Sequence, residues 1–232
     1  MSRIELISPE GLRVDGRRAG ELRRFYSKIG SIQQADGSAY VEMGNTKVIV
    51  GVYGPKEQSK GADRSMINVE FNIASFASSS SKNSKTDRRQ LEMASFVKRT
   101  FEPVIQSNTF SRSEIDIFIQ IIQTDGGILH AAINATCLAI IDAGIPMSDY
   151  VVACSAGYAN DQPMMDLNYI EESAESPLLT LALCPKSEKI TLLNMECRLH
   201  LDNFEDVMTL AKEGCMILSE SLDETIRQSA NR

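Results

Sequence analysis

The stretch Ile128–Ala143 constrains the fold more than any other part of the 232-residue chain. Its side chains are apolar nearly all round a helix, and small alanines recur along it. A helix without a polar face has to be buried, and small residues let it lie close to a sheet. Gly144 and Pro146 then provide a stop signal at its C-terminal end. The rest of the chain is therefore expected to fold around this helix.

Strand patterns occur on both sides of this helix in the sequence. Apolar residues alternate with polar ones in Met66–Phe76 and Ile115–Gln123, the period of a strand with one buried face. The Gly44–Asn45 pair joins two runs rich in Val, Ile and Tyr, which predicts a hairpin. The predicted strands are Leu22–Ile32, Ser38–Met43, Thr46–Tyr53, Met66–Phe76, Ile115–Gln123, Tyr150–Tyr158, Met164–Leu167, Leu178–Cys184 and Lys189–Glu196.

Further helices are predicted at Asp87–Gln106 and near the C-terminal end of the chain. The first has apolar residues at spacings of three and four. The second opens at Asp202, with Glu205 three residues later in the pattern of a capping box. Tyr169–Ala174 is predicted to be an acidic turn or a short helix, and the polar segments Lys56–Arg64 and Ser75–Lys85 are predicted to be loops.

Helices and strands mix in this order without strict alternation, which predicts an α+β fold with mixed sheets covered by helices. The length suits one well-buried domain. We expect a single domain over 1–232, with a β-rich first half at about 8–124 and a second half at about 125–228.

The charge of the chain argues against a general nucleic-acid binder, because the formal net charge is -7. The charge is uneven, however: residues 82–99 carry six bases and two acids. An RNA contact would therefore use a local patch near the first helix, unless these charges only form a solvated face. The sequence shows no secretory signal and no apolar run of about 20 residues, so we expect no membrane contact. Five cysteines without a CxxC pair favour a reducing intracellular compartment over zinc binding.

Three blocks of the sequence resemble the ribonuclease PH family, in that family's order and spacing, over about residues 8–228. Details of these blocks look most like ring subunits of the eukaryotic RNA exosome, the branch that corresponds to the catalytic ring subunit of the archaeal exosome. The blocks are Arg13–Arg18 (RVDGRR) with Glu21–Arg23; Ala35–Tyr40 (ADGSAY) with Gly44–Lys47 and Tyr53–Pro55; and Thr124–Gly127 (TDGG) with Asp142–Met147 (DAGIPM) and Asp166–Leu167.

The resemblance implies a ribonuclease-PH-like fold and a place in a hetero-oligomeric ring. The implied partners are other ribonuclease-PH-like ring subunits, cap subunits with OB-type and KH-type domains, a hydrolytic exoribonuclease, and RNA. It also implies RNA degradation and rRNA processing in the nucleus, nucleolus and cytoplasm, with no cofactor and no metal bound by this chain.

The resemblance also identifies a candidate active site around Gly126 and Gly127. Phosphorolysis requires fixed positive charge and donors to bring inorganic phosphate against the RNA end. Active relatives carry a Thr-Arg pair after the two glycines, whereas this chain has Ile128, Leu129 and His130. His130 could donate one hydrogen bond but does not replace a bidentate arginine, and it could also be a satisfied or surface histidine.

Active relatives also carry two aspartates, six residues apart, and only one is kept here. Glu172 follows Asp166 at that spacing. The extra methylene shifts the carboxylate by roughly 1.5 Å, which matters where geometry must hold within about 0.5 Å. Asp166 could still bind a cation or the RNA end, or it could cap the turn at Asn168–Tyr169. We expect a vestigial site made of Gly126, Gly127, Ile128, Leu129, His130, Asp166 and Glu172, with no catalytic residue.

Arg88 and Arg89 are the leading candidates for RNA contact. They occupy the first turn of a predicted helix, where cations oppose the helix dipole, so stability does not explain them. The resemblance places position 89 at a phosphate-site arginine of ribonuclease PH. Lys60 and Arg64, in the preceding loop, are weaker candidates for lining the entrance of a channel.

The sequence therefore predicts a non-catalytic exosome ring subunit, an inactive homologue of phosphorolytic ribonucleases, that guides RNA through a central channel. The alternative is a phosphate-dependent 3′–5′ exoribonuclease. A third possibility is a free-standing homo-hexamer, but the exosome-like details favour a hetero-ring.

Overall fold

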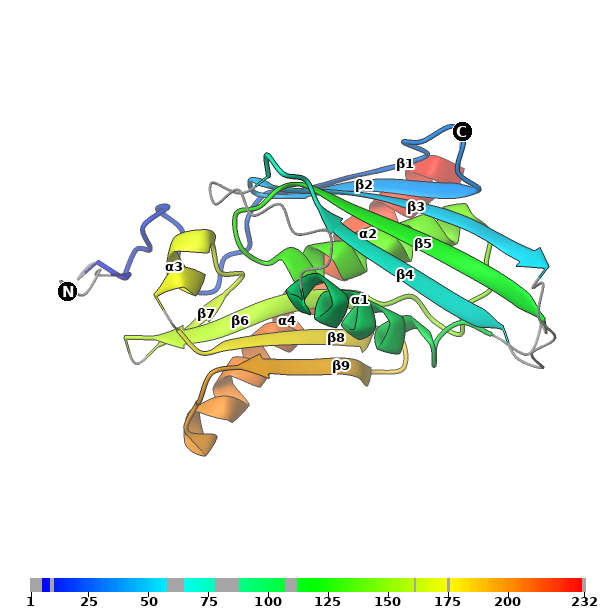
Figure 1. Cartoon of the computed structure of the whole chain (residues 1–232). Helices are drawn as coiled ribbons and strands as arrows, with labels where there is room; N and C mark the ends of the chain where they lie inside the picture. Colours follow the sequence, from blue (N-terminus) through cyan, green and yellow to red (C-terminus); the bar gives the residue numbers. More distant parts are fainter. Residues whose placement is uncertain are drawn as a thin grey trace.

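The computed structural model describes residues 6–8, 11–57, 65–77, 88–106, 112–160, 162–174 and 176–230. Two sheets lie on either side of a central helix (Figure 1). The first sheet has the order β1-β2-β3-β5-β4 and the second the order β7-β6-β8-β9. The strands are β1 Phe25–Ile29, β2 Gly37–Met43, β3 Thr46–Glu57, β4 Met66–Ile73, β5 Ser113–Gln123, β6 Val152–Ala159, β7 Gln162–Met165, β8 Leu178–Cys184 and β9 Lys189–Glu196.

The first sheet is mixed. The strand β4 pairs with β5 in parallel, whereas the pairs β1–β2, β2–β3 and β3–β5 are antiparallel. The hairpin β2–β3 turns at Gly44, whose φ of 60° suits a glycine. In β5 the residues Ile115, Ile117, Ile119 and Ile121 are all buried, as the period of two predicts. The expected α+β class with mixed sheets covered by helices is confirmed.

The central helix is α2, Ile128–Asp142, and its residues from Leu129 to Ile140 are buried without exception. It packs against β2 and β3 of the first sheet and against β6 of the second. The approach is close: a Cβ added to Gly37 in β2 would lie 2.3 Å from the carbonyl oxygen of Ala139. The small residues of α2 and the glycine of β2 thus allow backbone to meet backbone.

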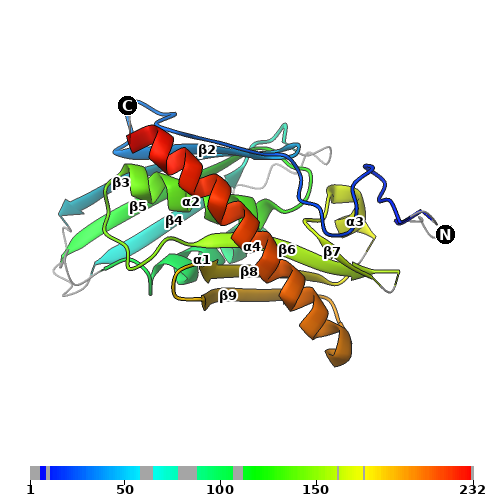
Figure 2. The same cartoon turned by 180° about the vertical axis from the view of Figure 1, so that it is seen from behind.

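Two further helices complete the layers. The helix α1, Arg88–Phe101, contacts β4 and β9 along one side of the two sheets (Figure 1). The helix α4, Leu201–Ala230, crosses the outer face of the second sheet and reaches β1 at its C-terminal end (Figure 2). No described helix is long and apolar enough to span a membrane.

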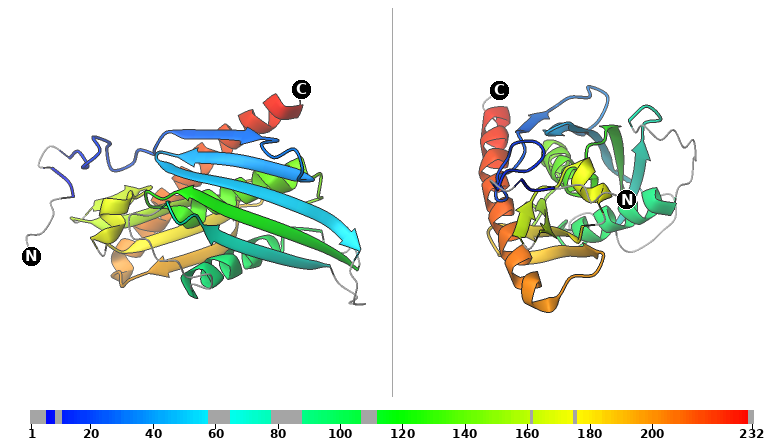
Figure 3. Two further views of the ribbon diagram at one scale, coloured as in Figure 1. Left: turned by 45° about the horizontal axis from the view of Figure 1, so that its top comes forward. Right: turned by 90° about the vertical axis from the view of Figure 1, so that its left-hand side faces the viewer.

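One hydrophobic core includes residues of both halves of the chain, from Ala39 in β2 to Leu222 in α4. Both views in Figure 3 show α4 and the two sheets enclosing α2. We propose that the chain folds as one domain around this shared core, with the expected halves at about 8–124 and 125–228 as its two contributors.

The structure corrects the expected cap of the last helix. Asp202 does not cap α4, because the helix already begins at Leu201 and Asp202 lies within its first turn. A capping box is present instead at α3, Tyr169–Ser173, where Asn168 and Glu171 satisfy each other's backbone N–H groups. The expected loops lie largely outside the described residues, except that Lys56 belongs to β3.

Candidate functional site

The candidate site begins where β5 leads into α2 through Gly126 and Gly127. Both glycines have left-handed backbone angles, with φ of 77° and 66°. A Cβ on Gly127 would lie 2.1 Å from Cε1 of His130 and 2.7 Å from Nη2 of Arg23. Backbone conformation and space therefore both require glycine at 127, which explains the glycine pair ahead of this helix.

Asp166 lies beside these glycines, directly after β7, and it is fully buried with a φ of 52°. Arg23 encloses its carboxylate. The backbone N and Nε of Arg23 donate to Oδ2 at 3.0 and 2.9 Å, and Nη2 donates to Oδ1 at 2.7 Å. Arg23 also donates to the carbonyl oxygen of Asp125 at 2.6 Å, so one side chain ties Asp166 to the loop before α2.

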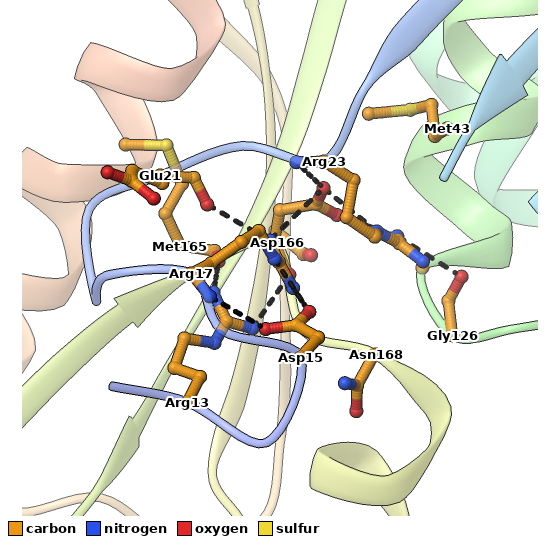
Figure 4. Close-up of polar contacts among 12 residues, drawn as sticks. Arg13, Asp15, Arg17, Glu21, Arg23, Met43, Gly126, Met165, Asp166 and Asn168 are labelled. Atoms are coloured by element: carbon orange, nitrogen blue, oxygen red, sulfur yellow. Dashed lines mark hydrogen bonds and ion pairs between the residues drawn. The ribbon is translucent and has the colours of Figure 1, made fainter. Parts of the chain in front are cut away.

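Two more arginines bind the backbone of Asp166 (Figure 4). Arg13 donates to its carbonyl oxygen at 3.0 Å, and Arg17 donates to the same atom at 3.1 Å. Arg13 also forms a buried ion pair with Glu171, in which two guanidinium nitrogens contact the two carboxylate oxygens. We call Arg13, Arg17, Arg23 and Asp166 the arginine cluster.

The arginine cluster fixes the ionisation of Asp166. Burial alone would raise the pKa of this carboxyl, but the contact with His130 and the charge and hydrogen bonds of Arg23 outweigh burial. The pKa of Asp166 is therefore held far below its usual value. Its oxygens are engaged by Arg23, so its role in this structure is to join the N-terminal segment to the site.

Glu172 lies on the other side of the glycine pair. Its Oε1 accepts a hydrogen bond of 2.6 Å from the backbone N–H of Gly127. Burial raises the pKa of this carboxyl, and the hydrogen bond from Gly127 and the charges of His130, Arg23 and Arg89 offset only part of that rise. Asp166 and Glu172 thus differ in the direction of their pKa shifts although they are six residues apart.

A small cavity lies at this end of α2, with a volume of about 20 Å³, which is room for about one water molecule. Arg89 of α1 and two carboxylate side chains, Glu172 and Glu196 of β9, line it together with the first residues of α2. We call Arg89, Gly127, His130 and Glu172 the anion pocket, because an arginine and a helix N-terminus are the groups that attract anions.

His130 is buried between the arginine cluster and the anion pocket, with its side chain 1% exposed. Its Nε2 lies 3.2 Å from Oδ1 of Asp166, a contact that is ionic when the ring is protonated. Neither ring nitrogen has a hydrogen bond of regular geometry within the described part of the chain. His130 is thus neither a surface histidine nor a fully satisfied one.

The structure brings Gly126, Gly127, Ile128, Leu129, His130, Asp166 and Glu172 together at one end of α2. Arg89 joins them, whereas Arg88 is 93% exposed and pairs with Glu92 at 3.1 Å. Lys60 and Arg64 lie outside the described residues. The turn at Asn168–Tyr169 is capped by Asn168 and not by Asp166, so that interpretation of Asp166 is wrong.

The sequence interpretation assigned no site role to Arg13, Arg17 or Arg23, although it quoted them as part of a motif. Their partners lie more than 140 positions away in the chain, between Met165 and Glu171. The one available signal was the density of arginine in residues 13–24. Over the described ranges, no group of three or more His, Cys, Asp and Glu side chains is placed to hold a metal ion.

Comparison with known proteins agrees with this geometry. The model described as "3′ exoribonuclease family, domain 1" matches residues 21–146, and "3′ exoribonuclease family, domain 2" matches residues 149–214. The chain is 43% identical to "Exosome complex component RRP41 homolog" of Arabidopsis thaliana, over 99% of this chain and 97% of the relative. It is 44% identical to "Exosome complex component RRP41" of Homo sapiens, over 98% and 96% of the two chains.

Solved structures share the fold. The crystal structure of Rrp46 from rice (Oryza sativa) has a TM-score of 0.82 at 23% identity, covering 92% of this chain and 100% of that one. An Archaeoglobus fulgidus exosome, described as having RNA bound to the active site, has a TM-score of 0.78 at 22% identity, covering 91% and 93%.

These matches overturn one expectation from the sequence, that the chain is not an enzyme. Both halves of the chain match the models of a family of 3′ exoribonucleases. The sequence argument gave decisive weight to the side chains of Ile128 and Leu129. An anion site at a helix N-terminus is built from backbone N–H groups, and these do not depend on side-chain identity.

Proposed function

The chain belongs to the 3′ exoribonuclease family, and from this premise we propose that it is a ring subunit of an RNA exosome that acts on the 3′ ends of RNA. Its similarity to exosome complex components, which extends over nearly the whole chain, supports a place in the ring. Its ring neighbours would be other ribonuclease-PH-like subunits. Cap subunits with OB-type and KH-type domains and a hydrolytic exoribonuclease would join the same assembly in the nucleus, nucleolus and cytoplasm.

The observation that carries the proposed function is the anion pocket. Arg89 of α1 and the N-terminus of α2 line one small cavity, although they come from separate elements. A guanidinium and a helix N-terminus both favour a phosphate group. These groups attract a phosphate of an RNA 3′ end, or inorganic phosphate placed against that end, although the cavity has room for about one water molecule until the Glu172 side chain moves.

The pocket also favours a more specific activity, phosphate-dependent 3′–5′ exoribonucleolysis. In that reaction inorganic phosphate attacks the terminal phosphodiester, the bond to the 3′ oxygen of the shortened RNA breaks, and a nucleoside diphosphate leaves. Arg89 would hold the attacking phosphate, and the partial positive charge at the start of α2 would offset the developing negative charge.

Arg88 supports a different part of the proposal, the passage of RNA through the ring. Its side chain is almost fully exposed at the first turn of α1, one residue before the arginine of the pocket. We propose that Arg88, together with Lys60 and Arg64, binds the phosphate backbone of RNA, while Arg89 faces the reacting end. Each such contact would make RNA affinity depend on salt concentration.

Assembly is tested by co-expressing the chain with candidate ring subunits and measuring the mass of the purified complex. The expected result is a closed ring that contains this chain in a fixed stoichiometry. A chain that copurifies with none of these subunits, while its melting is cooperative, would overturn the ring assignment.

The activity is tested on the assembled ring, with a 5′-labelled RNA, in the presence and absence of inorganic phosphate. Phosphate-dependent shortening with release of nucleoside diphosphates would support phosphorolysis, and Arg89→Ala should reduce it far more than Arg88→Ala. RNA left intact in both conditions would overturn the phosphorolytic assignment but not the ring assignment, which the mass measurement tests separately.

A further inference from the structure

The anion pocket already contains an anion, the carboxylate of Glu172. Its Oε1 lies 2.6 Å from the backbone nitrogen of Gly127. Gly127 is the residue that precedes the 15-residue helix α2, and as a glycine it has no side chain to cap the first turn. Glu172 reaches this position from α3, so the acceptor comes from a separate element.

Glu172 uses the attractive groups that a phosphate would need. The charges of Arg89, His130 and Arg23 act on its carboxylate in addition to the N–H of Gly127. A carboxylate carries one negative charge and two oxygens, whereas a phosphate at neutral pH carries more of both. The same groups therefore suit a phosphate at least as well as they suit Glu172.

His130 provides a second observation that points to a ligand in the pocket. Its ring is buried, it lines the same cavity, and its Nδ1 has no hydrogen-bond partner among the described residues. Buried polar atoms are almost always satisfied by protein or by a bound molecule. Glu172 leaves this nitrogen unused, and a tetrahedral anion in the pocket would have additional oxygens for it.

The backbone around Glu172 is held by more contacts than its side chain is. The preceding residue, Glu171, is fully buried and forms an ion pair with Arg13, and it also completes the capping box of α3. Among the described residues, the Glu172 side chain makes one hydrogen bond, to Gly127. A rotation of this one side chain would empty the pocket without moving α3.

We propose that Glu172 is an internal competitor for the anion pocket, so that phosphate binds there only when the carboxylate of Glu172 is displaced. This inference rests on the proposed function, since it assumes that the pocket acts on phosphate. It adds a means of control. Without phosphate, the side chain of Glu172 occupies the anion pocket, and the phosphate concentration sets the fraction of molecules in which it is displaced.

The test is phosphate binding by the full-length chain, in its ring if the ring is required for solubility, measured by calorimetry with inorganic phosphate. Glu172→Gln keeps the shape but removes the charge, and it should bind phosphate about tenfold more tightly than the parent. Glu205→Gln, at an exposed position of α4, is the matched control and should leave the affinity unchanged.

Two further variants locate the effect. Glu172→Ala should bind phosphate at least as tightly as Glu172→Gln, and adding Arg89→Ala to Glu172→Gln should abolish the gain. Equal phosphate affinities of parent and Glu172→Gln would overturn the proposal, and so would the absence of phosphate binding by both. Neither result would affect ring assembly. Thermal melting of each variant verifies that a lost affinity does not reflect unfolding.

Discussion

The arginine cluster and the anion pocket each contain a buried carboxylate, and the pKa values of these two carboxyls shift in opposite directions. In the arginine cluster, Asp166 has a guanidinium against both oxygens, and the pKa of its carboxyl is lowered in spite of burial. In the anion pocket, Glu172 has one backbone hydrogen bond, and burial raises the pKa of its carboxyl. Burial alone therefore does not assign a role to a carboxylate; the number of donors that face it does. Asp166 belongs to the framework, whereas one backbone hydrogen bond holds the carboxylate of Glu172.

Removing one partner of the Arg23–Asp166 pair should have the largest effect on stability. Asp166→Asn or Arg23→Met leaves a buried charge without its counterpart, which costs about 3–5 kcal/mol of unfolding free energy. Denaturant unfolding measures this loss. The double variant Arg23→Met with Asp166→Leu should recover part of it, because neither charge remains buried. A loss under about 1 kcal/mol for Asp166→Asn would remove the contrast between the two carboxylates.

Gly127→Ala should have the next largest effect, with Gly144→Ala as its matched control. Both glycines have left-handed angles, with φ of 66° and 68°, but an added Cβ meets His130 and Arg23 at 127 and open space at 144. The backbone cost is about 1–2 kcal/mol at each position. Crowding at 127 adds about 1–3 kcal/mol. Thermal melting of the two variants measures the difference. Equal melting temperatures would mean that the side chains of His130 and Arg23 shift to accommodate the added Cβ at little cost.

The pH dependence of stability should separate the two carboxylates by sign. The pKa of Asp166 is lowered in the folded state, so its stabilisation is present above its unfolded pKa near 4 and is lost as the pH falls further. The pKa of Glu172 is raised, so its contribution is present below its ordinary value of about 4.5 and is lost as the pH rises through the folded pKa.

Unfolding free energies measured from pH 3 to pH 7 test these signs. Asp166→Asn should flatten the acidic side of the curve, and Glu172→Gln should flatten the side above about pH 4.5, each by up to about 1.4 kcal/mol per pH unit. Exposed Glu205→Gln serves as the control. Parallel curves for parent and Glu172→Gln would indicate that the carboxylate of Glu172 is not strained by burial.

The smallest effect is expected for Arg88→Ala. Its pair with Glu92 is solvent-exposed, so the unfolding free energy should change by less than about 0.5 kcal/mol. In the assembled ring, however, Arg88→Ala should weaken the binding of long RNA and reduce its salt dependence. Unchanged RNA affinity at low salt would leave Arg88 as part of a solvated surface.

The sequence predicted the parts of the molecule that depend on local patterns. α2 was predicted within one residue at its C-terminal end, because its uniform apolarity has no other explanation than burial. The strands β4 and β5 follow from alternation, and the hairpin β2–β3 follows from two runs rich in Val, Ile and Tyr around the Gly44–Asn45 pair. The glycine pair before α2 was predicted to be part of the site because the motif that carries the family resemblance, Thr124–Gly127, is a run of consecutive residues.

The sequence predicted which residues lie at the site, but not the hydrogen bonds and ion pairs that join them. Residues 126–130, 166 and 172 were named, but the bonds from Arg23 to Asp166 join positions that are 143 residues apart. No period or spacing encodes such a contact. The helix caps illustrate the same limit: Asp202 was predicted to cap α4 but lies within its first turn, whereas Asn168 caps α3, because tertiary packing decides where each helix starts.

The N-terminal segment has a consequence for how the chain is made. Arg13 is synthesised before both of its partners: its acceptor at Asp166 follows 153 residues later and its ion-pair partner Glu171 follows 158 residues later. At about 5–20 residues per second, Arg13 waits about 8 to 30 seconds before its partners have been synthesised. During that interval the segment offers unpaired cationic side chains to any anionic surface nearby. Vectorial synthesis thus places the closure of this site after the strands of the first sheet, β1 to β5, have been synthesised.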